Sequence, residues 1–207
     1  VSPAHAAAWR ATFGKDATPS SAIDPRGTLE EHGTHTTSYS VVDAMGNAVA
    51  VTYTLSDYFG AHVVVPGTGI LLNNTMINLD GEPGRPDSFA GGKEPISTMS
   101  PTIVLRDGKP FLVVGRAGGA RLAPAPLAMI RNVVDYGMNV QDAITEPRVH
   151  EQWHPDVVTM EPDAISPAVR TALEALGYTF RVVRHAPQDS DGVEVLPDGT
   201  LLGGYDP

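Results

Sequence analysis

The sequence predicts an α/β fold in which strands paired in hairpins form layers with helices. Short runs rich in Val, Thr and Tyr flank turn residues at 43–47, 107–109 and 197–199, which is the pattern of β-hairpins. Apolar residues recur at helical spacing in 124–136 and again after Ser166. Glycine and proline, at 21 and 18 residues, suit a chain with many strands and loops. Hairpins with helices between them fit a layered α/β sandwich.

The first hairpin is predicted to bring hydroxyl residues together. A three-residue loop at 44–46 has glycine in its third place, where the left-handed conformation is needed. Counting outward from this loop sets Thr36 opposite Thr54, on a strand face that carries mostly small or hydroxyl residues. The opposite face is predicted to be buried because it carries larger, mostly apolar residues: Tyr39, Val41, Val49, Val51, Tyr53 and Leu55.

Thr36 is a candidate nucleophile that becomes usable after the chain is cut before it. A threonine hydroxyl is a weak nucleophile without a nearby base. Cleavage between His35 and Thr36 would place a new α-amine on the same residue, and the reference pKa of such an amine lies near neutrality. The alternative is an ordinary strand start, because Thr, Ser, Tyr and Val all favour strands.

A second hairpin surrounds Asp107 and Gly108, and its second strand runs into Gly118 and Gly119. Adjacent glycines at a strand exit either form a tight turn with positive φ or let backbone N–H groups converge on one point. Arg116 precedes them, and it either binds a carboxylate of a substrate or forms a structural ion pair.

The second half of the chain is predicted to alternate helices with strands. A helix over 124–136 has proline in its first turn and Leu127, Ile130 and Val134 at helical spacing, and a shorter helix covers 140–145. Ser166 is predicted to cap a helix over 167–177. This helix should turn Val169, Leu173 and Leu176 inward. A strand at 178–183 and a hairpin around 197–199 follow.

Composition excludes several classes of protein. The net charge of −10, with 14 Lys and Arg against 24 Asp and Glu, argues against nucleic acid and anionic membranes as partners. Zero cysteines exclude disulfides and thiol chemistry. His150 and His154 are four residues apart, but Pro147 and Pro155 disfavour a helix there and no third ligand is evident. We therefore expect no metal and no other cofactor.

Several motifs, in order along the chain, resemble the γ-glutamyltransferase family. They are TTSYSVVD at 36–43, GNAVAVTYTL at 46–55, GILLNN at 69–74, PISTMSPTIV at 95–104 and GG at 118–119. The resemblance implies a four-layer αββα sandwich of the N-terminal-nucleophile hydrolase type. It also implies a precursor that cleaves itself before a threonine. Residues 1–35 would be the end of the large subunit with a linker, and residues 36–207 the small, catalytic subunit.

The resemblance further implies an enzyme that cleaves γ-glutamyl amides such as glutathione and passes the acyl group to water or an amine. Its partner would be the large subunit of the same precursor, and its location periplasmic or secreted. Thr36 would be the nucleophile, oriented by Thr54. Backbone N–H groups of Gly118 and Gly119 would stabilise the oxyanion.

The same resemblance assigns substrate-binding positions. Ser97 and Thr98 match a serine pair that contacts the substrate carboxylate. Ser56, Thr75 and Asn78 stand where the family usually has Asn, Gln or Glu, and Asp, around the α-amino group of the substrate. A neutral amide at Asn78 accepts a hydrogen bond but cannot pair with an ammonium charge.

These departures, with Arg116, leave two alternatives to a γ-glutamyl enzyme. One is a related amidase of the same fold that takes glutaryl-cephalosporins or γ-linked polymers. The other is a non-catalytic homologue in which Thr36 is never released. The loop at 79–94 is short for this family, which indicates either a more open cleft or a neutral deletion.

Overall fold

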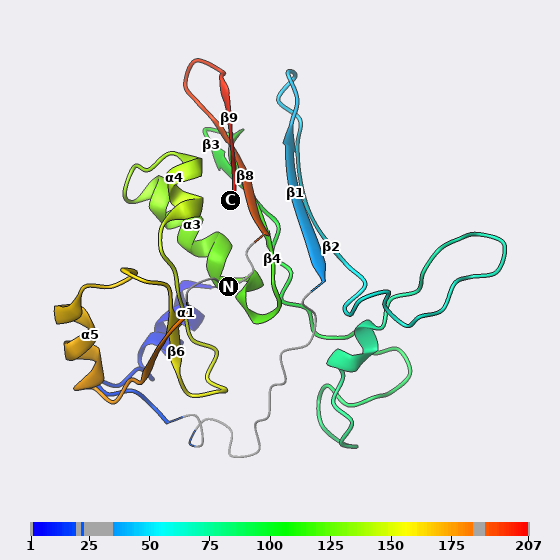
Figure 1. Cartoon of the computed structure of the whole chain (residues 1–207), viewed down its shortest axis with the longest axis horizontal. Helices are drawn as coiled ribbons and strands as arrows, with labels where there is room; N and C mark the ends of the chain where they lie inside the picture. The colour runs from blue at the N-terminus through cyan, green and yellow to red at the C-terminus, as the bar shows by residue number, and fades with distance from the viewer. Residues whose placement is uncertain (1, 20–21, 23–34, 184–188, 207) are drawn as a thin grey trace. The chain divides into compact units, whose positions relative to one another are not determined.

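The structure is a computed structural model that describes residues 2–19, 22, 35–183 and 189–206 (Figure 1). Residues 23–34 of the expected linker lie outside the described residues. The chain forms two compact units. One consists of Val1–Leu29 and Pro147–Arg184, and the other of Glu30–Glu146 and His185–Pro207. All the predicted site residues belong to the second unit.

The second unit contains a four-stranded antiparallel sheet. Its strands, in spatial order, are β3 (Thr102–Arg106), β4 (Lys109–Ala117), β8 (Asp189–Val195) and β9 (Leu201–Tyr205). Both hairpins predicted in this region are confirmed. Asp107 and Gly108 link β3 to β4 with φ of 52° and 77°, the left-handed values that a two-residue hairpin loop requires.

The smaller sheet of this unit is the hairpin of β1 (Thr36–Val42) and β2 (Ala48–Thr54). Its predicted register is confirmed, because Thr36 pairs with Thr54 and Val42 with Ala48. The loop forms as expected, with Gly46 at φ 82°. Asp43 accepts hydrogen bonds from the backbone N–H groups of Met45 and Asn47. Turn chemistry thus sets which residues share a face.

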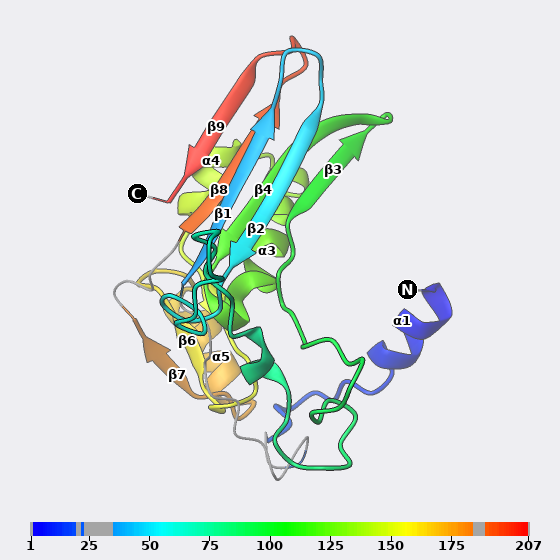
Figure 2. The ribbon, with the colours of Figure 1, turned by 90° about the vertical axis from the view of Figure 1, so that its right-hand side faces the viewer.

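The hydroxyl face of this hairpin packs on the larger sheet, where β1 contacts both β4 and β8 (Figures 1 and 2). The approach is close: a Cβ atom on Gly115 of β4 would lie 2.1 Å from the Ser38 hydroxyl oxygen. Small side chains on β1 and a glycine on β4 allow the two sheets to meet at this distance.

The prediction of the buried face of the hairpin is therefore wrong for this chain. Thr36 is buried, whereas Tyr53 is 60% exposed and Tyr39, Val41 and Val49 are about half exposed. Alternation along a strand shows that two faces differ, but the neighbouring layer decides which face is enclosed. Here the larger sheet packs on the face with small residues. Among the described residues, no further layer covers the apolar face.

Two helices cover the other face of the four-stranded sheet, α3 (Pro124–Val134) and α4 (Val140–Thr145) (Figure 1). Both predicted helices are confirmed. The core between helices and sheet consists of Phe111, Leu112, Val114, Met129, Val133, Val140, Ala143 and Ile144. The N-terminus of α4 is held by Asn139, which accepts from the Asp142 N–H at 2.9 Å, and by the buried Glu194 carboxylate, which accepts from the Val140 N–H at 3.0 Å.

Of the three apolar positions identified on α3, Ile130 packs against the core, but the other two lie outside the buried face. Leu127 and Val134 are exposed, and Met129 and Val133 are buried with Ala125 and Pro126. The predicted set and the buried set both recur at helical spacing and are shifted by one residue along the helix. The spacing alone therefore does not decide which set is buried. Two short 3-10 helices complete this unit, η1 (Thr75–Asn78) and η2 (Gly119–Leu122).

The first unit contains α1 (Pro3–Arg10), α5 (Pro167–Glu174) and a three-stranded sheet of β5 (Val149–His150), β6 (Val158–Met160) and β7 (Phe180–Val182). Ser166 caps α5 as predicted, accepting from the Val169 N–H at 3.3 Å. The inward orientation predicted for α5 is wrong, since Val169 and Leu176 are exposed and no residue of the helix is buried. Strands of two or three residues are too short to enclose a helix face. Within the described ranges, no helix has the length and apolarity that crossing a bilayer requires.

Candidate functional site

The site is organised around Thr36, the first residue of β1. Its side chain is buried and donates from Oγ1 to Oγ1 of Thr54 at 3.2 Å. The contact follows from the hairpin register, which sets these two residues directly opposite each other. A hydroxyl held next to a second hydroxyl has a fixed direction, which a nucleophile needs before it can react.

Thr54 connects this hydroxyl to the peptide bond that precedes it. Its Oγ1 donates to the carbonyl oxygen of His35 at 3.4 Å and accepts from the Ser56 N–H at 2.8 Å. The His35 carbonyl belongs to the bond whose cleavage would free the amine of Thr36. One side chain therefore contacts both the candidate nucleophile and the candidate electrophile of a self-cleavage reaction.

The chain turns sharply after β2. Ser56 is buried and has φ of 77°, a left-handed conformation that is uncommon outside glycine and is found at functional sites. Asp57, the next residue, is tied to Asn74, whose side-chain amide donates to the Asp57 carboxylate at 2.7 Å and accepts from the Asp57 N–H at 3.0 Å. This pair fixes the turn that carries Ser56.

An aromatic contact lies next to the same turn. The rings of His35 and Tyr58 are stacked, with centroids 3.0 Å apart and planes 27° apart. Because His35 precedes Thr36, the stack restrains the chain on the N-terminal side of the candidate cleavage point. Sequence reasoning did not identify this contact or the Asp57–Asn74 pair.

Gly118 and Gly119 follow β4 and begin η2, with φ of 122° and 56°. These values suit glycine and give the loop a conformation that other residues rarely adopt. Among the described residues, no hydrogen bond is recorded from the backbone N–H of either glycine. Two neighbouring donors of this kind form a potential oxyanion site.

Thr98 lies against this glycine loop, since its hydroxyl donates to the Gly119 carbonyl oxygen at 3.0 Å. Ser97 is exposed, and its hydroxyl accepts from the Met99 N–H at 3.2 Å. The structure thus brings Thr98 to the candidate oxyanion loop, while it records Ser97 in a local turn.

Thr75 and Asn78 lie at the two ends of η1. The Asn78 side-chain amide donates to the Ile96 carbonyl oxygen at 3.4 Å, which ties η1 to the segment that leads to Ser97 and Thr98. Thr75 donates from its backbone N–H to the Asn73 side chain, at 3.0 Å. The predicted positions of the substrate amine and carboxylate are therefore connected through Asn78 and Ile96.

Arg116 is enclosed, at 2% exposure, one residue before the end of β4. Its Nε donates to the carbonyl oxygen of Ala117 at 3.0 Å. The side chain lies beside Gly118, where an added Cβ atom would be 3.6 Å from Nε.

Comparison with known proteins identifies the family of this chain. A sequence profile described as gamma-glutamyltranspeptidase matches residues 1–207. The chain belongs to the gamma-glutamyltranspeptidase family. The glutathione hydrolase proenzyme of Escherichia coli K12 is 44% identical over 201 residues, which cover 92% of this chain and 34% of that protein. The acylase ACY 1 proenzyme of Pseudomonas sp. SE83 is 41% identical over 171 residues, or 81% of this chain and 30% of that protein.

Solved structures of the family share the fold. The T380A mutant of Helicobacter pylori gamma-glutamyltranspeptidase superposes with a TM-score of 0.74 at 39% identity, covering 83% of this chain and 98% of that one. The cephalosporin acylase of Bacillus halodurans covers all of this chain and 37% of its own, with a TM-score of 0.79 at 26% identity. The predicted α/β sandwich of the N-terminal-nucleophile hydrolase type is confirmed. Of its αββα layers, the described residues form the two sheets and the helices α3 and α4.

The chain spans about a third of the length of the curated relatives it matches. The matched segment makes up 34% of the Escherichia coli glutathione hydrolase proenzyme and 30% of the acylase proenzyme. The remaining length of those relatives is the basis for proposing a partner segment.

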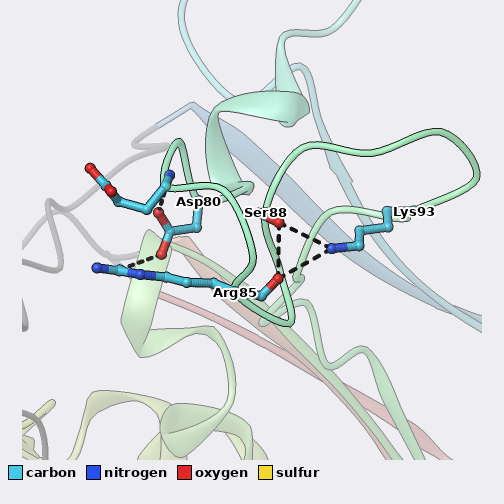
Figure 3. A network of polar contacts seen from close by, with 5 residues as sticks. Asp80, Arg85, Ser88 and Lys93 are labelled. Atoms are coloured by element: carbon cyan, nitrogen blue, oxygen red, sulfur yellow. Dashed lines mark hydrogen bonds and ion pairs between the residues drawn. The ribbon is translucent and has the colours of Figure 1, made fainter.

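The loop at 79–94, which is short for this family, is held by polar contacts among its own residues (Figure 3). Arg85 forms an ion pair with Asp80, and its carbonyl oxygen accepts from the Ser88 hydroxyl at 2.9 Å and from the Lys93 ammonium at 3.3 Å. Lys93 also donates to the Ser88 hydroxyl, at 3.3 Å. These contacts join residues of the loop to one another and so help to hold its conformation.

Within the described part of the chain, no group of three His, Asp or Glu side chains is arranged to hold a metal. His150, considered as a ligand because of its spacing from His154, lies in β5 with a ring nitrogen 2.9 Å from the Gln152 side-chain oxygen. Both histidines belong to the other unit of the chain from Thr36.

Proposed function

We propose that this chain is the catalytic part of a self-processing threonine amidase of the gamma-glutamyltranspeptidase family. The enzyme cuts its own chain between His35 and Thr36 and then cleaves γ-glutamyl amide bonds. The observation that supports it most directly is the position of Thr54, whose Oγ1 contacts both the Thr36 hydroxyl and the His35 carbonyl oxygen.

Self-cleavage follows from these contacts. The Thr36 Oγ1 attacks the His35 carbonyl carbon, and the hydrogen bond from Thr54 stabilises the negative charge that forms on the carbonyl oxygen. The C–N bond breaks as the nitrogen of Thr36 takes the proton that left its hydroxyl, and an ester links His35 to the threonine oxygen. Water hydrolyses this ester, leaving a carboxylate on His35 and a free amine and hydroxyl on Thr36.

Turnover uses the same hydroxyl. The new amine of Thr36 accepts the hydroxyl proton, and Oγ1 attacks the side-chain amide of the substrate. The N–H groups of Gly118 and Gly119 stabilise the tetrahedral oxyanion. The amine then gives its proton to the leaving nitrogen. Water or an acceptor amine removes the acyl group from Thr36, which releases acid or a new amide.

The partner is the segment that corresponds to the large subunit of the related proenzymes. The apolar face of the β1–β2 hairpin is open in the described residues, with Tyr39, Val41, Val49 and Tyr53 each about half exposed or more. A row of this kind on one strand face is the surface that a further layer of the sandwich would cover. The match covers only 34% of the Escherichia coli relative, and the rest of that protein leaves room for such a layer.

A related amidase with a different acyl group is the second candidate. Ser56, Thr75 and Asn78 are all neutral, so none supplies a carboxylate for the ammonium of a γ-glutamyl substrate. A relative at 41% identity is named an acylase. Under this alternative the enzyme prefers acyl groups that lack the α-amine, as in glutaryl amides.

The first experiment is the intact mass of the complete gene product as a function of time, beside the Thr36→Ala variant. We expect two fragments that meet at His35 and Thr36 in the wild type and a single chain in the variant. A wild-type chain that stays whole at every pH and time would contradict the proposal and favour a non-catalytic homologue.

The second experiment compares hydrolysis of a γ-glutamyl anilide and the matching glutaryl anilide by the matured enzyme. A higher kcat/KM for the γ-glutamyl anilide supports the first candidate, and a higher value for the glutaryl anilide supports the second. The two substrates differ only in the α-amine, so the ratio measures recognition of that group.

A further inference from the structure

Arg116 is a buried cation that the mechanism above does not use. It is 2% exposed, so its guanidinium is removed from solvent at the end of β4. Enclosing a charge is costly unless polar groups compensate. The contact at its Nε is with the backbone, where it donates to the Ala117 carbonyl oxygen at 3.0 Å.

The position of that carbonyl connects Arg116 to the oxyanion site. The Ala117 carbonyl and the Gly118 N–H belong to one planar peptide unit, so holding the oxygen also fixes the direction of the N–H. A charged donor on the oxygen also polarises the peptide, and a polarised peptide is a stronger donor at its N–H.

The second candidate donor is held in a comparable way. The carbonyl of Gly118 accepts from the Arg121 N–H at 3.2 Å, and that carbonyl shares its peptide unit with the Gly119 N–H. Each of the two peptides that supply an oxyanion donor thus has a partner at its carbonyl. The Ala117–Gly118 peptide differs in that its partner, the Arg116 guanidinium, carries a full charge.

We propose that Arg116 is a positioning residue that aligns and polarises the Ala117–Gly118 peptide. It thereby strengthens the Gly118 N–H as a donor to the oxyanion formed when Thr36 attacks its substrate. This inference rests on the proposed function of the site. It differs from direct binding of a substrate carboxylate by Arg116, because the residue is enclosed and its Nε donates to a backbone carbonyl.

The test measures kcat and KM of the matured complete gene product with the anilide that the wild type hydrolyses faster. Arg116→Met removes the charge and the Nε donor but fills similar space, and Arg116→Lys keeps a charge without the Nε donor. Arg106→Met is the matched control. It removes a cation from the other end of the same hairpin, where Arg106 stacks on Phe111 at 3.5 Å.

We expect kcat to fall about 10- to 100-fold in Arg116→Met, since complete loss of an oxyanion donor costs about 10²- to 10³-fold. KM should change by less than about two-fold, because the oxyanion contact is made only in the transition state. Arg116→Lys should recover part of kcat, and Arg106→Met should retain the wild-type value.

Other outcomes would overturn the inference. An increase in KM with kcat unchanged would show that Arg116 contacts the substrate. A lower Tm with wild-type kcat, measured where the variant is folded, would show a purely structural role. Variants that fail to self-cleave are assayed after co-expression of segments that end at His35 and begin at Thr36. If Arg116→Met does not fold, wild-type kcat in Arg116→Lys decides against the inference.

A wild-type protein inactive on both anilides would instead count against the proposed function itself, and the inference would fall with it. Activity in the wild type together with unchanged kcat in Arg116→Met would overturn the inference alone. The two failures are therefore distinguishable in one set of assays.

Discussion

The Oγ1 atoms of Thr36 and Thr54 lie 3.2 Å apart, on the first and last residues of two paired strands. Thr54 reaches the His35 carbonyl oxygen from the same atom, at 3.4 Å. The hairpin therefore places the nucleophile and the carbonyl group of a potential cleavage reaction within hydrogen-bond distance of one hydroxyl. The loop at 44–46 sets this geometry from the opposite end of the hairpin, because it fixes the strand register.

Removing the Thr54 hydroxyl should slow self-cleavage. We expect Thr54→Ala to reduce the rate about 10²- to 10³-fold, the usual cost of losing one donor to a developing oxyanion. Thr54→Ser should retain most of the rate because it keeps Oγ. Thr52→Ala is the control, since the Thr52 hydroxyl lies on the same face without a recorded hydrogen bond among the described residues. Intact mass over time gives the rates, and equal rates for the two alanine variants would contradict the role of Thr54.

The stack of His35 on Tyr58 should assist self-cleavage by holding the peptide before Thr36. Aromatic pairs contribute about 0.5–1.5 kcal/mol, so we expect Tyr58→Ala to slow cleavage by about 2- to 10-fold. Tyr58→Phe should keep the wild-type rate because the ring remains. A double-mutant cycle with His35→Ala provides the check. If the two alanine effects multiply, the stack does not act as a unit.

Much of this fold is predictable from the sequence because local chemistry determines it. Loop glycines and the Asp107–Gly108 turn set the hairpins, and the register that the first loop imposes is enough to place Thr36 opposite Thr54. The bounds of α4 also follow from pattern alone. What pattern does not supply is the identity of the covering layer, which is why the apolar face of β1–β2 is predicted to be buried and proves exposed.

The rest of the site depends on contacts between residues far apart in sequence. Asp57 meets Asn74 across a loop, and Tyr58 meets His35 across the whole first hairpin. Arg116 is unusual in the sequence, but only the structure shows that it is buried and that its Nε donates to the Ala117 carbonyl oxygen. The Asn-Asn pair at 73–74 is the one sequence signal for the first contact, since a partly enclosed amide usually has a hydrogen-bond partner.

The Glu194 carboxylate should stabilise α4. It accepts from the Val140 N–H, which has no partner inside the helix because it lies in the first turn. Glu194→Ala leaves this buried donor unpaired, and we expect a loss of about 1–3 kcal/mol in the free energy of unfolding. Glu194→Gln keeps an acceptor oxygen and should lose less. Denaturant unfolding of both variants measures the difference. Equal losses of unfolding free energy would show that an acceptor oxygen at this position does not stabilise α4.

The turn of the first hairpin should be sensitive to acid. Hydrogen bonds from the side chain and backbone of Asn47 lower the pKa of Asp43 below its ordinary value of 3.8. A carboxyl whose pKa is depressed by folding stabilises the folded state above its unfolded pKa, and this contribution is lost as the pH falls through the folded pKa. Asp43→Asn should therefore be less stable than wild type at neutral pH, and the difference should shrink as the pH falls through the folded pKa of Asp43. A stability difference that stays constant with pH would contradict the assignment.

Gly115 should be required for the close contact between the two sheets. A Cβ atom at this position would lie 2.1 Å from the Ser38 hydroxyl oxygen but 3.5 Å from the Ser38 Cβ. Gly115→Ala therefore overpacks the interlayer, and we expect a loss of about 1–3 kcal/mol in the free energy of unfolding. Adding Ser38→Ala removes the oxygen and leaves an ordinary contact, so the double variant should recover most of the loss. Ser38→Ala alone serves as the control. If the double variant is no more stable than Gly115→Ala, the strain comes from another neighbour, of which the Asp191 carboxylate, 3.3 Å from the same position, is the nearest.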